Sequence, residues 1–503
     1  MSGTVAETMT GLVEGSADAG VVVFRGIPFA RPPLGPLRFR PPQPPTPWAG
    51  TRDASRPGPI AVQHPSPLET VFSDERPEIG EDCLSLNVWT PAPDDGRRPV
   101  MVWIHGGSFL TGSGSTPWYD GSSFARRHDA VVVTINYRLG AFGFLHLADL
   151  GGEACASSGN AGLLDQVAAL EWVRDNIAAF GGDPEAVTVF GESAGAMSIG
   201  CLLGLPAAAG LFRRAILQSG AASNAQGRDQ ATAAARDLLA ELGLGSAPAD
   251  LAQLQDVPAE ALLAAQATLA QRVGAAGLAF LPVVDGTTLT RPPLDSVAAG
   301  SAERVDLLTG TNLDEMRLFT MLDPNLIVDD DAVLAARCDE LWAGDGQAAL
   351  AAYRTGRPAA PPGEVWTAIL SDRFFRIPAV RLAERHRRAG ASTYVYLFTW
   401  ATPSFGGALG SCHDLEIPFV FNRLDDPAVA AFTGPPTPEA RRLALAIHDA
   451  WAAFARTGDP SHPGLPPWPG YDEEERWTMV LAEQPHVEQD PAGHERVVWP
   501  TTD

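Results

Sequence analysis

The chain has 503 residues, of which 45% are hydrophobic and 19% are charged. This composition supports a large folded core and excludes a wholly disordered chain. Its 36 basic residues are all Arg, and 60 acidic residues give a formal charge of −24, so we expect no nucleic-acid partner, because a polyanion would be repelled.

Five cysteines are scattered along the chain without a C-x-x-C pair, at positions 83, 155, 201, 338 and 412. This odd set predicts neither a zinc site nor a disulfide framework, and reduced thiols are typical of the cytoplasm. The first 20 residues lack an apolar stretch of signal-peptide length, and no apolar run reaches the ~18–20 residues that cross a bilayer. We therefore expect a cytoplasmic protein without a membrane partner.

The first segment with a distinct pattern covers residues 20–50 and is rich in proline. Its interleaved aromatic residues, among them Phe29 and Trp48, favour an irregular segment packed on a core over a free polyproline ligand.

A series of short apolar runs follows, and each predicts a strand covered on both faces, as in a parallel sheet. These runs lie at residues 84–89, 100–104, 130–135, 187–190, 305–309 and 393–399. Apolar residues at helical spacing predict helices at 161–179 and 439–456. Strands that alternate with helices indicate an α/β fold.

Two further regions, residues 225–280 and 320–390, are predicted to be mostly helical. The sequence contains no internal repeat, and no Gly/Ser linker divides it into parts. We therefore expect one catalytic domain over residues 1–503, with helical insertions at about 222–280 and 320–390.

The chain contains one G-x-S-x-G motif, in which Ser193 lies between Gly191 and Gly195. The motif follows a predicted strand and precedes an apolar stretch that can form a helix, which is the setting of a nucleophile elbow. The serine of an elbow occupies a sharp, strained turn, so the residues two positions away must lack bulk. The motif therefore predicts Ser193 as a nucleophile, and the alternative is an ordinary glycine-rich loop.

A serine hydroxyl needs a base to become a good nucleophile, and in the chain order that accompanies this motif an acid and then a histidine follow the serine. Among the six later histidines, His413 follows the strand predicted at 393–399, where an α/β active site collects its residues. His386 lies among arginines, which indicates a solvated face. For the acid, Asp314 and Glu315 both follow the strand predicted at 305–309, and spacing does not choose between them.

The glycine pair Gly106-Gly107 follows the strand predicted at 100–104. Such a pair lets backbone N–H groups approach a developing oxyanion, and the N–H of Ala194 would complete the hole. The alternative is a plain tight turn. The preceding His105 is expected to be structural.

Together these segments resemble the type-B carboxylesterases of the α/β-hydrolase superfamily, which include bacterial para-nitrobenzyl-type esterases and the cholinesterases. The resemblance runs over nearly the whole chain and rests on motifs in family order, at residues 24–30, 81–88, 136–140, 160–166, 190–196 and 282–286. It implies a bacterial protein with the α/β-hydrolase fold, a large and mostly parallel sheet flanked by helices.

The resemblance also implies the roles of the site residues. Ser193 would be the nucleophile, Glu315 the acid, because it ends a G-x-x-x-x-E pattern, and His413 the base, because it precedes an E-[IL]-P-F stretch. The oxyanion hole and a supporting second-layer serine would be formed by Gly106, Gly107, Ala194 and Ser219.

Eukaryotic members of the family pair the cysteine of the second signature with an upstream cysteine. No cysteine precedes Cys83 here, so that bridge is absent. Cys412 adjoins His413; we expect a small filler residue, and the alternative is a thiol that makes activity sensitive to oxidation.

The resemblance predicts hydrolysis of small carboxylic esters through an acyl-enzyme, by a monomer that needs neither a metal nor an organic cofactor. The same triad acting on carbamates, amides or aromatic diesters is an alternative, and a catalytically silent binding module is a more remote one. Four aromatic residues near the motifs either line the substrate pocket or fill the core: Phe109, Trp118, Phe405 and Phe419.

Overall fold

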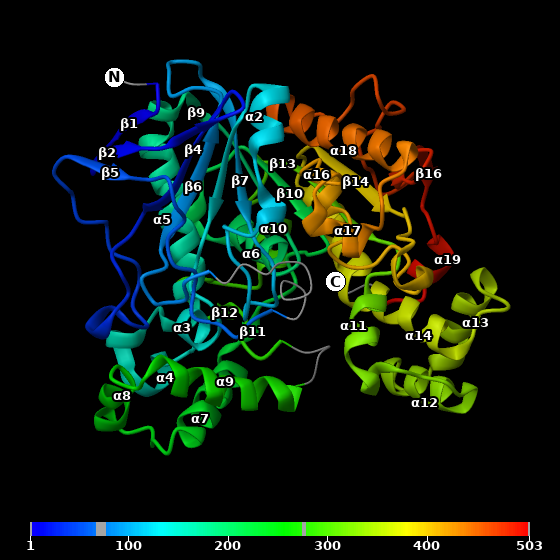
Figure 1. Ribbon diagram of the computed structural model, residues 1–503. Helices are drawn as coiled ribbons and strands as arrows, with labels where there is room; N and C mark the ends of the chain where they lie inside the picture. Colours follow the sequence, from blue (N-terminus) through cyan, green and yellow to red (C-terminus); the bar gives the residue numbers. More distant parts are fainter. Residues whose placement is uncertain (1–2, 67–76, 274–277, 501–503) are drawn as a thin grey trace.

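The computed structural model describes residues 3–66, 77–273 and 278–500. Its central sheet is built from β3 (Ser16–Asp18), β4 (Val21–Pro28), β6 (Ser85–Thr90), β7 (Arg98–Ile104), β8 (Val131–Ile135), β9 (Gly182–Glu192), β10 (Arg214–Gln218), β13 (Asp306–Asn312), β14 (Thr393–Phe398), β15 (Trp477–Leu481) and β16 (His486–Gln489). These 11 strands lie in the order β16-β15-β14-β13-β10-β9-β7-β8-β6-β4-β3 (Figure 1).

The middle of this sheet, from β15 to β8, is parallel. The strands at its two edges are antiparallel to their neighbours. Two small sheets lie outside it, formed by β1 (Val5–Thr8), β2 (Gly11–Glu14) and β5 (Thr51–Asp53), and by β11 (Gln226–Gly227) and β12 (Val283–Val284).

The helices, in chain order, are α2 (Ser122–His128), α3 (Gly140–Phe144), α4 (Ala148–Gly151), α5 (Ala161–Asn176), α6 (Ala194–Gly204), α7 (Arg228–Glu241), α8 (Pro248–Leu254), α9 (Ala259–Val273), α10 (Pro293–Ala298), α11 (Met316–Leu322), α12 (Asp331–Leu341), α13 (Gly346–Gly356), α14 (Pro362–Ser371), α15 (Ile377–Arg388), α16 (Ile417–Val420), α17 (Pro427–Thr433), α18 (Pro438–Thr457) and α19 (Gly493–Arg496). In Figure 1, α7–α9 and α11–α14 form two separate helical groups along the lower side of the view.

Both faces of the sheet are covered, which explains why its strands read as continuous apolar runs. Along β7, Val102 and Ile104 pack into the core cluster that includes residues of α5 and α6, whereas Met101 and Trp103 pack into the cluster that includes residues of α2 and α18. All four side chains are fully buried. The alternation follows from the two-residue period of a strand.

The strands predicted from apolar runs are present, and the helices predicted at 161–179 and 439–456 are α5 with the 3₁₀ turn after it and α18. The prediction for residues 20–50 is wrong for its first part, because β4 occupies Val21–Pro28 and pairs with β6. A register shift between Phe24 and Ile27 interrupts the alternation that identifies a strand. The central strand β10 is not predicted either, because only its three middle residues are apolar and Arg214 and Gln218 flank them.

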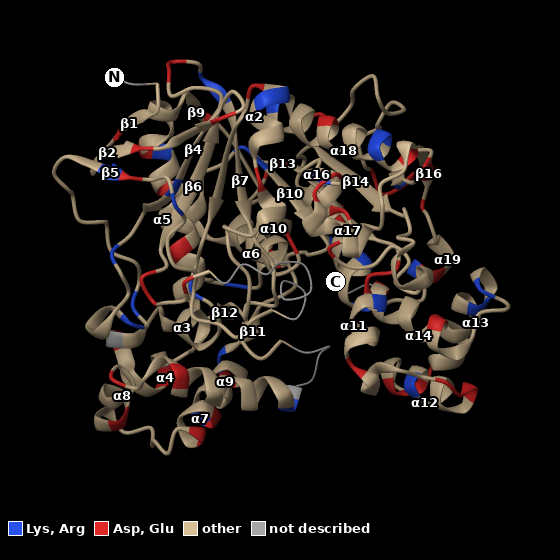
Figure 2. Cartoon of the chain, in the orientation of Figure 1, with Lys and Arg blue, Asp and Glu red and all other residues tan. Residues whose placement is uncertain are grey.

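Acidic and basic residues are interspersed over the ribbon rather than separated into faces (Figure 2). Many of the arginines are paired with nearby carboxylates, as in the pair between Arg97 and Asp183 and the pair between Arg127 and Asp449. Within the described ranges, no helix combines the length and the apolar character needed to cross a bilayer.

Candidate active site

Ser193 occupies a sharp turn between β9, which ends at Glu192, and α6, which begins at Ala194. Its backbone has φ 53° and ψ −124°, a region that non-glycine residues rarely adopt and that stores strain. The Ser193 N–H donates to the Gln218 carbonyl at 2.9 Å, and its own carbonyl accepts from Met197 N–H at 2.8 Å. These bonds hold the turn, as expected for a nucleophile elbow.

The two motif glycines are required because the end of β7 passes directly against them. A Cβ at Gly195 would lie 2.0 Å from the Ile104 carbonyl oxygen, and one at Gly191 would lie 2.6 Å from the same atom. Both distances are far inside van der Waals contact. The G-x-S-x-G pattern is therefore explained by packing of the elbow on β7.

His413 and Glu315 form a buried hydrogen-bonded pair. His413 Nδ1 lies 2.6 Å from Glu315 Oε2, and Glu315 Oε1 accepts from the Asn312 N–H at 2.7 Å. Because an ionised carboxylate only accepts, Nδ1 carries the proton and Nε2 is left to act as a base. Asp314, the other candidate acid, instead pairs with Arg317 at 3.1 Å.

A second layer of hydrogen-bonded side chains supports the His413–Glu315 pair. The Glu416 carboxylate accepts from Gln218 Nε2 at 3.0 Å and from Asn312 Nδ2 at 2.6 Å. Gln218 Oε1 in turn accepts from Trp451 Nε1 of α18 at 3.0 Å. Glu416 belongs to the motif that contains His413, but the sequence alone assigned it no role.

Glu192 and Asp414 flank the imidazole on its other side. Glu192 Oε1 lies 3.2 Å from His413 Nε2, the nitrogen that would accept the serine proton. Glu192, His413 and Asp414 each offer an atom that could ligate a cation, and these atoms lie within 4.8 Å of one another.

This crowding of carboxyl groups shifts several pKa values. Burial alone would lower the pKa of His413, but the carboxylates of Asp414 and Glu315 raise it to about 9. Burial, followed by the nearby charge of Asp414, raises the pKa of Glu192 well above its usual range. Burial and the charge of Glu315 raise the pKa of Glu416 to about 7. Strongly shifted groups gathered around one histidine are typical of an active site.

The loop after β7 brings Gly106 against the nucleophile. A Cβ at Gly106 would lie 3.0 Å from Ser193 Cβ, and Gly107 has φ +101°, so both positions favour glycine. Ala194 is the first residue of α6, and N–H groups of a first helical turn have no intrahelical acceptor. The arrangement can therefore present N–H donors to a developing negative charge beside Ser193.

His105 supports this loop. Its ring stacks on Tyr137 with 4.5 Å between centroids, and Tyr137 Oη donates to the His105 carbonyl at 2.8 Å. Burial lowers the pKa of His105 to about 4. Ser219 lies directly after β10, where its N–H donates to the Gly310 carbonyl at 2.9 Å, and its hydroxyl is buried.

The four aromatic residues predicted to line a substrate pocket or fill the core differ in their burial and in the rings that they contact. Phe109 is fully buried and packs edge-on against Phe144; Phe419 is also fully buried and packs on β14 through Phe398. Trp118 stacks on Phe432, and Phe405 is 56% exposed.

Two other rings lie against the imidazole of His413. Phe319 of α11 has its centroid 5.1 Å from the His413 ring, and Phe375 lies at 4.8 Å. Phe375 belongs to a π-helical segment, Asp372–Arg376, and such segments are frequent at functional sites. No sequence motif singled out these two residues, because their approach to His413 depends on tertiary packing.

Cys412 is a buried neighbour of His413. Burial, together with the negative charge of Asp414, raises the pKa of its thiol. A thiol held in its protonated form is a weak nucleophile and resists oxidation, which agrees with a filler residue.

The expectation of a solvated face at His386 is wrong. Its ring is fully buried, and Nδ1 lies 2.8 Å from Thr393 Oγ1. The arginines around it lie on the other sides of α15, so one helical position points inward among charged neighbours. His448 is also buried, with Nδ1 2.7 Å from the Val420 carbonyl.

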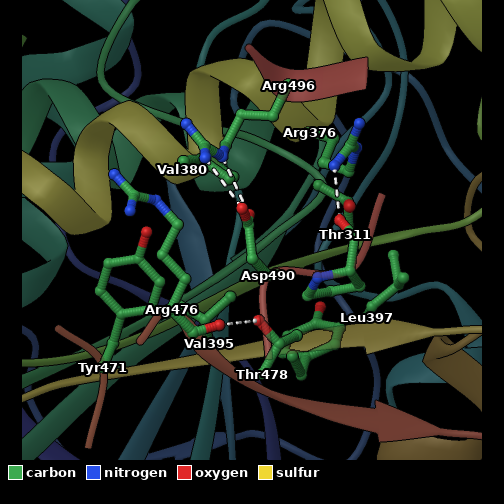
Figure 3. A pocket seen from close by; sticks show the side chains of 14 residues that line it. Thr311, Arg376, Val380, Val395, Leu397, Tyr471, Arg476, Thr478, Asp490 and Arg496 are labelled. Atoms are coloured by element: carbon green, nitrogen blue, oxygen red, sulfur yellow. Dashed lines mark hydrogen bonds and ion pairs between the residues drawn. The ribbon is translucent and has the colours of Figure 1, made fainter. Parts of the chain in front are cut away.

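A separate pocket lies over β13, β14 and β15, between α15 and the C-terminal segment (Figure 3). Its arginines are already paired: Arg496 with Asp490 at 2.8 Å and Arg476 with Glu384 at 2.9 Å. Arg376 likewise pairs with Asp372 at 2.6 Å. Because these charges are compensated, the residues serve to fix the C-terminal segment on the sheet.

A parallel sheet covered by helices, with a nucleophile elbow after β9 and a His–Glu pair at the ends of later strands, defines an α/β hydrolase. The family model described as "Carboxylesterase family" matches residues 2–499, and the chain belongs to this family. It is a carboxylic ester hydrolase, and a Ser-His-Glu triad is typical of the family.

Individual relatives agree with this assignment. The chain is 41% identical to a para-nitrobenzyl esterase of Bacillus subtilis (strain 168), over 99% of this chain and 98% of the relative. It is 38% identical to a phenmedipham hydrolase of Pseudarthrobacter oxydans, over 95% of each. A crystal structure of a Geobacillus stearothermophilus carboxylesterase superposes with a TM-score of 0.89 at 45% identity, covering 99% of this chain and 100% of that one.

Proposed function

We propose that Ser193, His413 and Glu315 carry out ester hydrolysis in this chain. The observation that carries the proposal is a strained Ser193 in a nucleophile elbow, combined with a buried histidine whose Nδ1 is fixed by Glu315 at 2.6 Å.

In the first step, His413 Nε2 takes the Ser193 proton while Oγ attacks the ester carbonyl. Glu315 keeps the imidazole in the required tautomer and stabilises the imidazolium. The N–H groups of Gly106, Gly107 and Ala194 would hold the tetrahedral oxyanion. His413 then gives its proton to the leaving alcohol. In the second half-reaction, His413 takes a proton from water as the water oxygen attacks the acyl carbonyl, and Ser193 leaves with that proton as the acid is released.

The proposal is tested by the Ser193→Ala variant on short p-nitrophenyl esters. We expect turnover to fall by roughly 10⁴- to 10⁶-fold, because the attacking oxygen is lost while binding remains. Ser223→Ala is the matched control, since it removes an exposed hydroxyl and should leave turnover unchanged. Near-wild-type turnover of Ser193→Ala would remove Ser193 from the mechanism.

The substrate class is proposed more narrowly as small esters, with Phe319 and Phe375 forming an apolar wall beside His413. Carbamates are the second candidate, because the same attack reaches a carbamate carbonyl. A relative bears the name phenmedipham hydrolase, so phenmedipham should be assayed beside matched p-nitrophenyl esters, carbamates and anilides. The highest kcat/KM among these decides the class.

We further propose that the chain acts as a single domain and a monomer in a bacterial cytoplasm. The supporting observations are the shared central sheet and five unpaired cysteines, which suit a reducing compartment. Light scattering after size-exclusion chromatography tests the oligomeric state: a mass near 53.1 kDa is expected, and a stable dimer mass would contradict it.

A further inference from the structure

The side of His413 that faces away from Glu315 carries a second cluster of donor atoms. Glu192, His413 and Asp414 offer one ligand atom each, and these atoms lie within 4.8 Å of one another. Glu192 and His413 are buried and Asp414 is half-buried. Three donors from two separate segments thus converge on one small volume.

The charge around this volume favours a cation. Glu315 and Glu192 each lie beside one ring nitrogen of His413, Asp414 lies near the same ring, and Glu416 lies one hydrogen bond further away, on Asn312. Among the ion pairs within residues 3–66, 77–273 and 278–500, none joins an arginine to any of these four. One imidazole cannot balance several carboxyl groups, and such an imbalance is costly in a buried site, so a metal ion would compensate it.

One oxygen of the cluster lacks a hydrogen bond. Glu192 Oε1 is buried and accepts no hydrogen bond from the part of the chain that the structure describes, although it lies 3.2 Å from His413 Nε2. Buried polar atoms are nearly always satisfied. This oxygen and the imidazole nitrogen that it faces are therefore already spaced like two ligands of one ion, and a metal ion would bind both atoms.

The donor set selects the class of ion. An imidazole nitrogen with two carboxylate oxygens suits Zn²⁺ and similar divalent transition metals, whereas Mg²⁺ and Ca²⁺ prefer oxygen ligands alone. Tetrahedral Zn²⁺ holds these ligands at about 2.0–2.2 Å, which places neighbouring donors about 3.4 Å apart. Glu192 Oε1 and His413 Nε2 already lie 3.2 Å apart, and all three donor atoms lie within 4.8 Å of one another.

We propose that Glu192, His413 and Asp414 form an inhibitory binding site for one Zn²⁺ ion. Zinc bound to Nε2 removes the lone pair that would take the Ser193 proton, so hydrolysis stops while the ion is bound. The inhibition rests on the proposed role of His413, whereas the binding itself does not.

Asp414 is the residue that tests the site. It has φ 67°, in the left-handed region, where Asn and Gly are the best-tolerated residues. Asp414→Asn and Asp414→Gly therefore remove the ligand charge without straining the loop. Asp425→Asn is the matched control, because Asp425 is exposed and pairs with Arg441.

The experiment uses the full chain, freed of metal with a chelator and then titrated with ZnCl₂ in a calorimeter and in an ester assay. We expect one site per chain, inhibition that follows occupancy, and no effect of MgCl₂ or CaCl₂. Both Asp414 variants should bind zinc at least roughly 10- to 100-fold more weakly, because even loss of an outer-shell partner has an effect of that size, whereas Asp425→Asn binds as the wild type does.

Absence of zinc binding, or equal affinity in the wild type and both Asp414 variants, would overturn the proposal. Equal affinity would indicate binding at exposed histidines such as His486. Zinc binding that depends on Asp414 in a protein without any metal-free esterase activity would keep the site and instead contradict the proposed function. Binding without inhibition would overturn the inhibitory role.

Discussion

Two buried clusters of charged residues contrast sharply within the same fold. In the first, the Arg138 guanidinium binds both oxygens of Asp165 at 2.7 Å, and the Arg138 N–H donates to the same carboxylate at 3.0 Å. One positive charge meets one negative charge, and both side chains are almost inaccessible to solvent.

In the second cluster, His413 meets the carboxyl groups of Glu192, Glu315, Asp414 and Glu416, and the charges are not matched. The consequence is a raised pKa of the imidazole. The balanced pair connects the segment after β8 to α5, whereas the unbalanced cluster sets the pH range in which the imidazole can accept a proton. We therefore expect mutations in the first cluster to lower stability, and mutations in the second to lower or retune activity.

Among the variants that test this contrast, Glu315→Gln is expected to have the largest effect on activity. The amide can no longer enforce the His413 tautomer or stabilise its cation, so kcat should fall on the order of 10³–10⁴-fold. The thermal midpoint should change little, since the shape of the side chain is kept. A large loss of stability with retained kcat would reverse the assignment of the two clusters.

Asp165→Asn breaks the balanced pair and leaves the Arg138 charge buried alone. We expect the free energy of unfolding to fall by about 3–5 kcal/mol, measured by denaturant titration, with kcat per folded active site retained. A double variant that also replaces Arg138 with Met should recover part of the loss, because both charges are then removed. No change in the denaturation midpoint of Asp165→Asn would contradict the structural role.

A smaller effect is expected when Asp414→Asn is assayed across pH in metal-free buffer. The carboxylate of Asp414 raises the pKa of His413, and only neutral His413 can accept the serine proton. Removing this charge lowers the pKa of His413, so the rising limb of the plot of kcat/KM against pH moves to lower pH by about one unit. A shift of that size corresponds to about 1.4 kcal/mol of interaction between Asp414 and the protonated imidazole. A limb that stays in place, or moves to higher pH, would show that Asp414 does not act on the base.

The sequence predicts much of the parallel core, since strands such as β7 and β8 are buried on both faces and therefore consist of apolar runs. It does not predict β4, where a register shift breaks the alternation, or the burial of His386, which depends on which side of α15 faces the sheet. The fold can thus be predicted where a pattern is repeated over many residues. It is missed where a single contact determines whether a segment pairs as a strand or a side chain is buried.

The same distinction applies to the candidate site. Ser193 and the glycine pair at 106 and 107 follow from local patterns, whereas the choice between Asp314 and Glu315 needed the family resemblance. Neither pattern nor resemblance indicated the approach of Glu192 to Nε2 or the packing of Phe375 on the imidazole, because these contacts join segments far apart in sequence and depend on rotamers.

The central claim is that the Ser193 oxygen is the nucleophile activated by His413. It is tested most directly by treating the protein with a p-nitrophenyl phosphonate and locating the adduct by peptide mass spectrometry. We predict one phosphonyl group per chain on the peptide that contains Ser193, with activity lost in proportion and labelling strongly slowed by Glu315→Gln. An adduct on a different residue, or full activity loss with an unmodified Ser193 peptide, would contradict the claim.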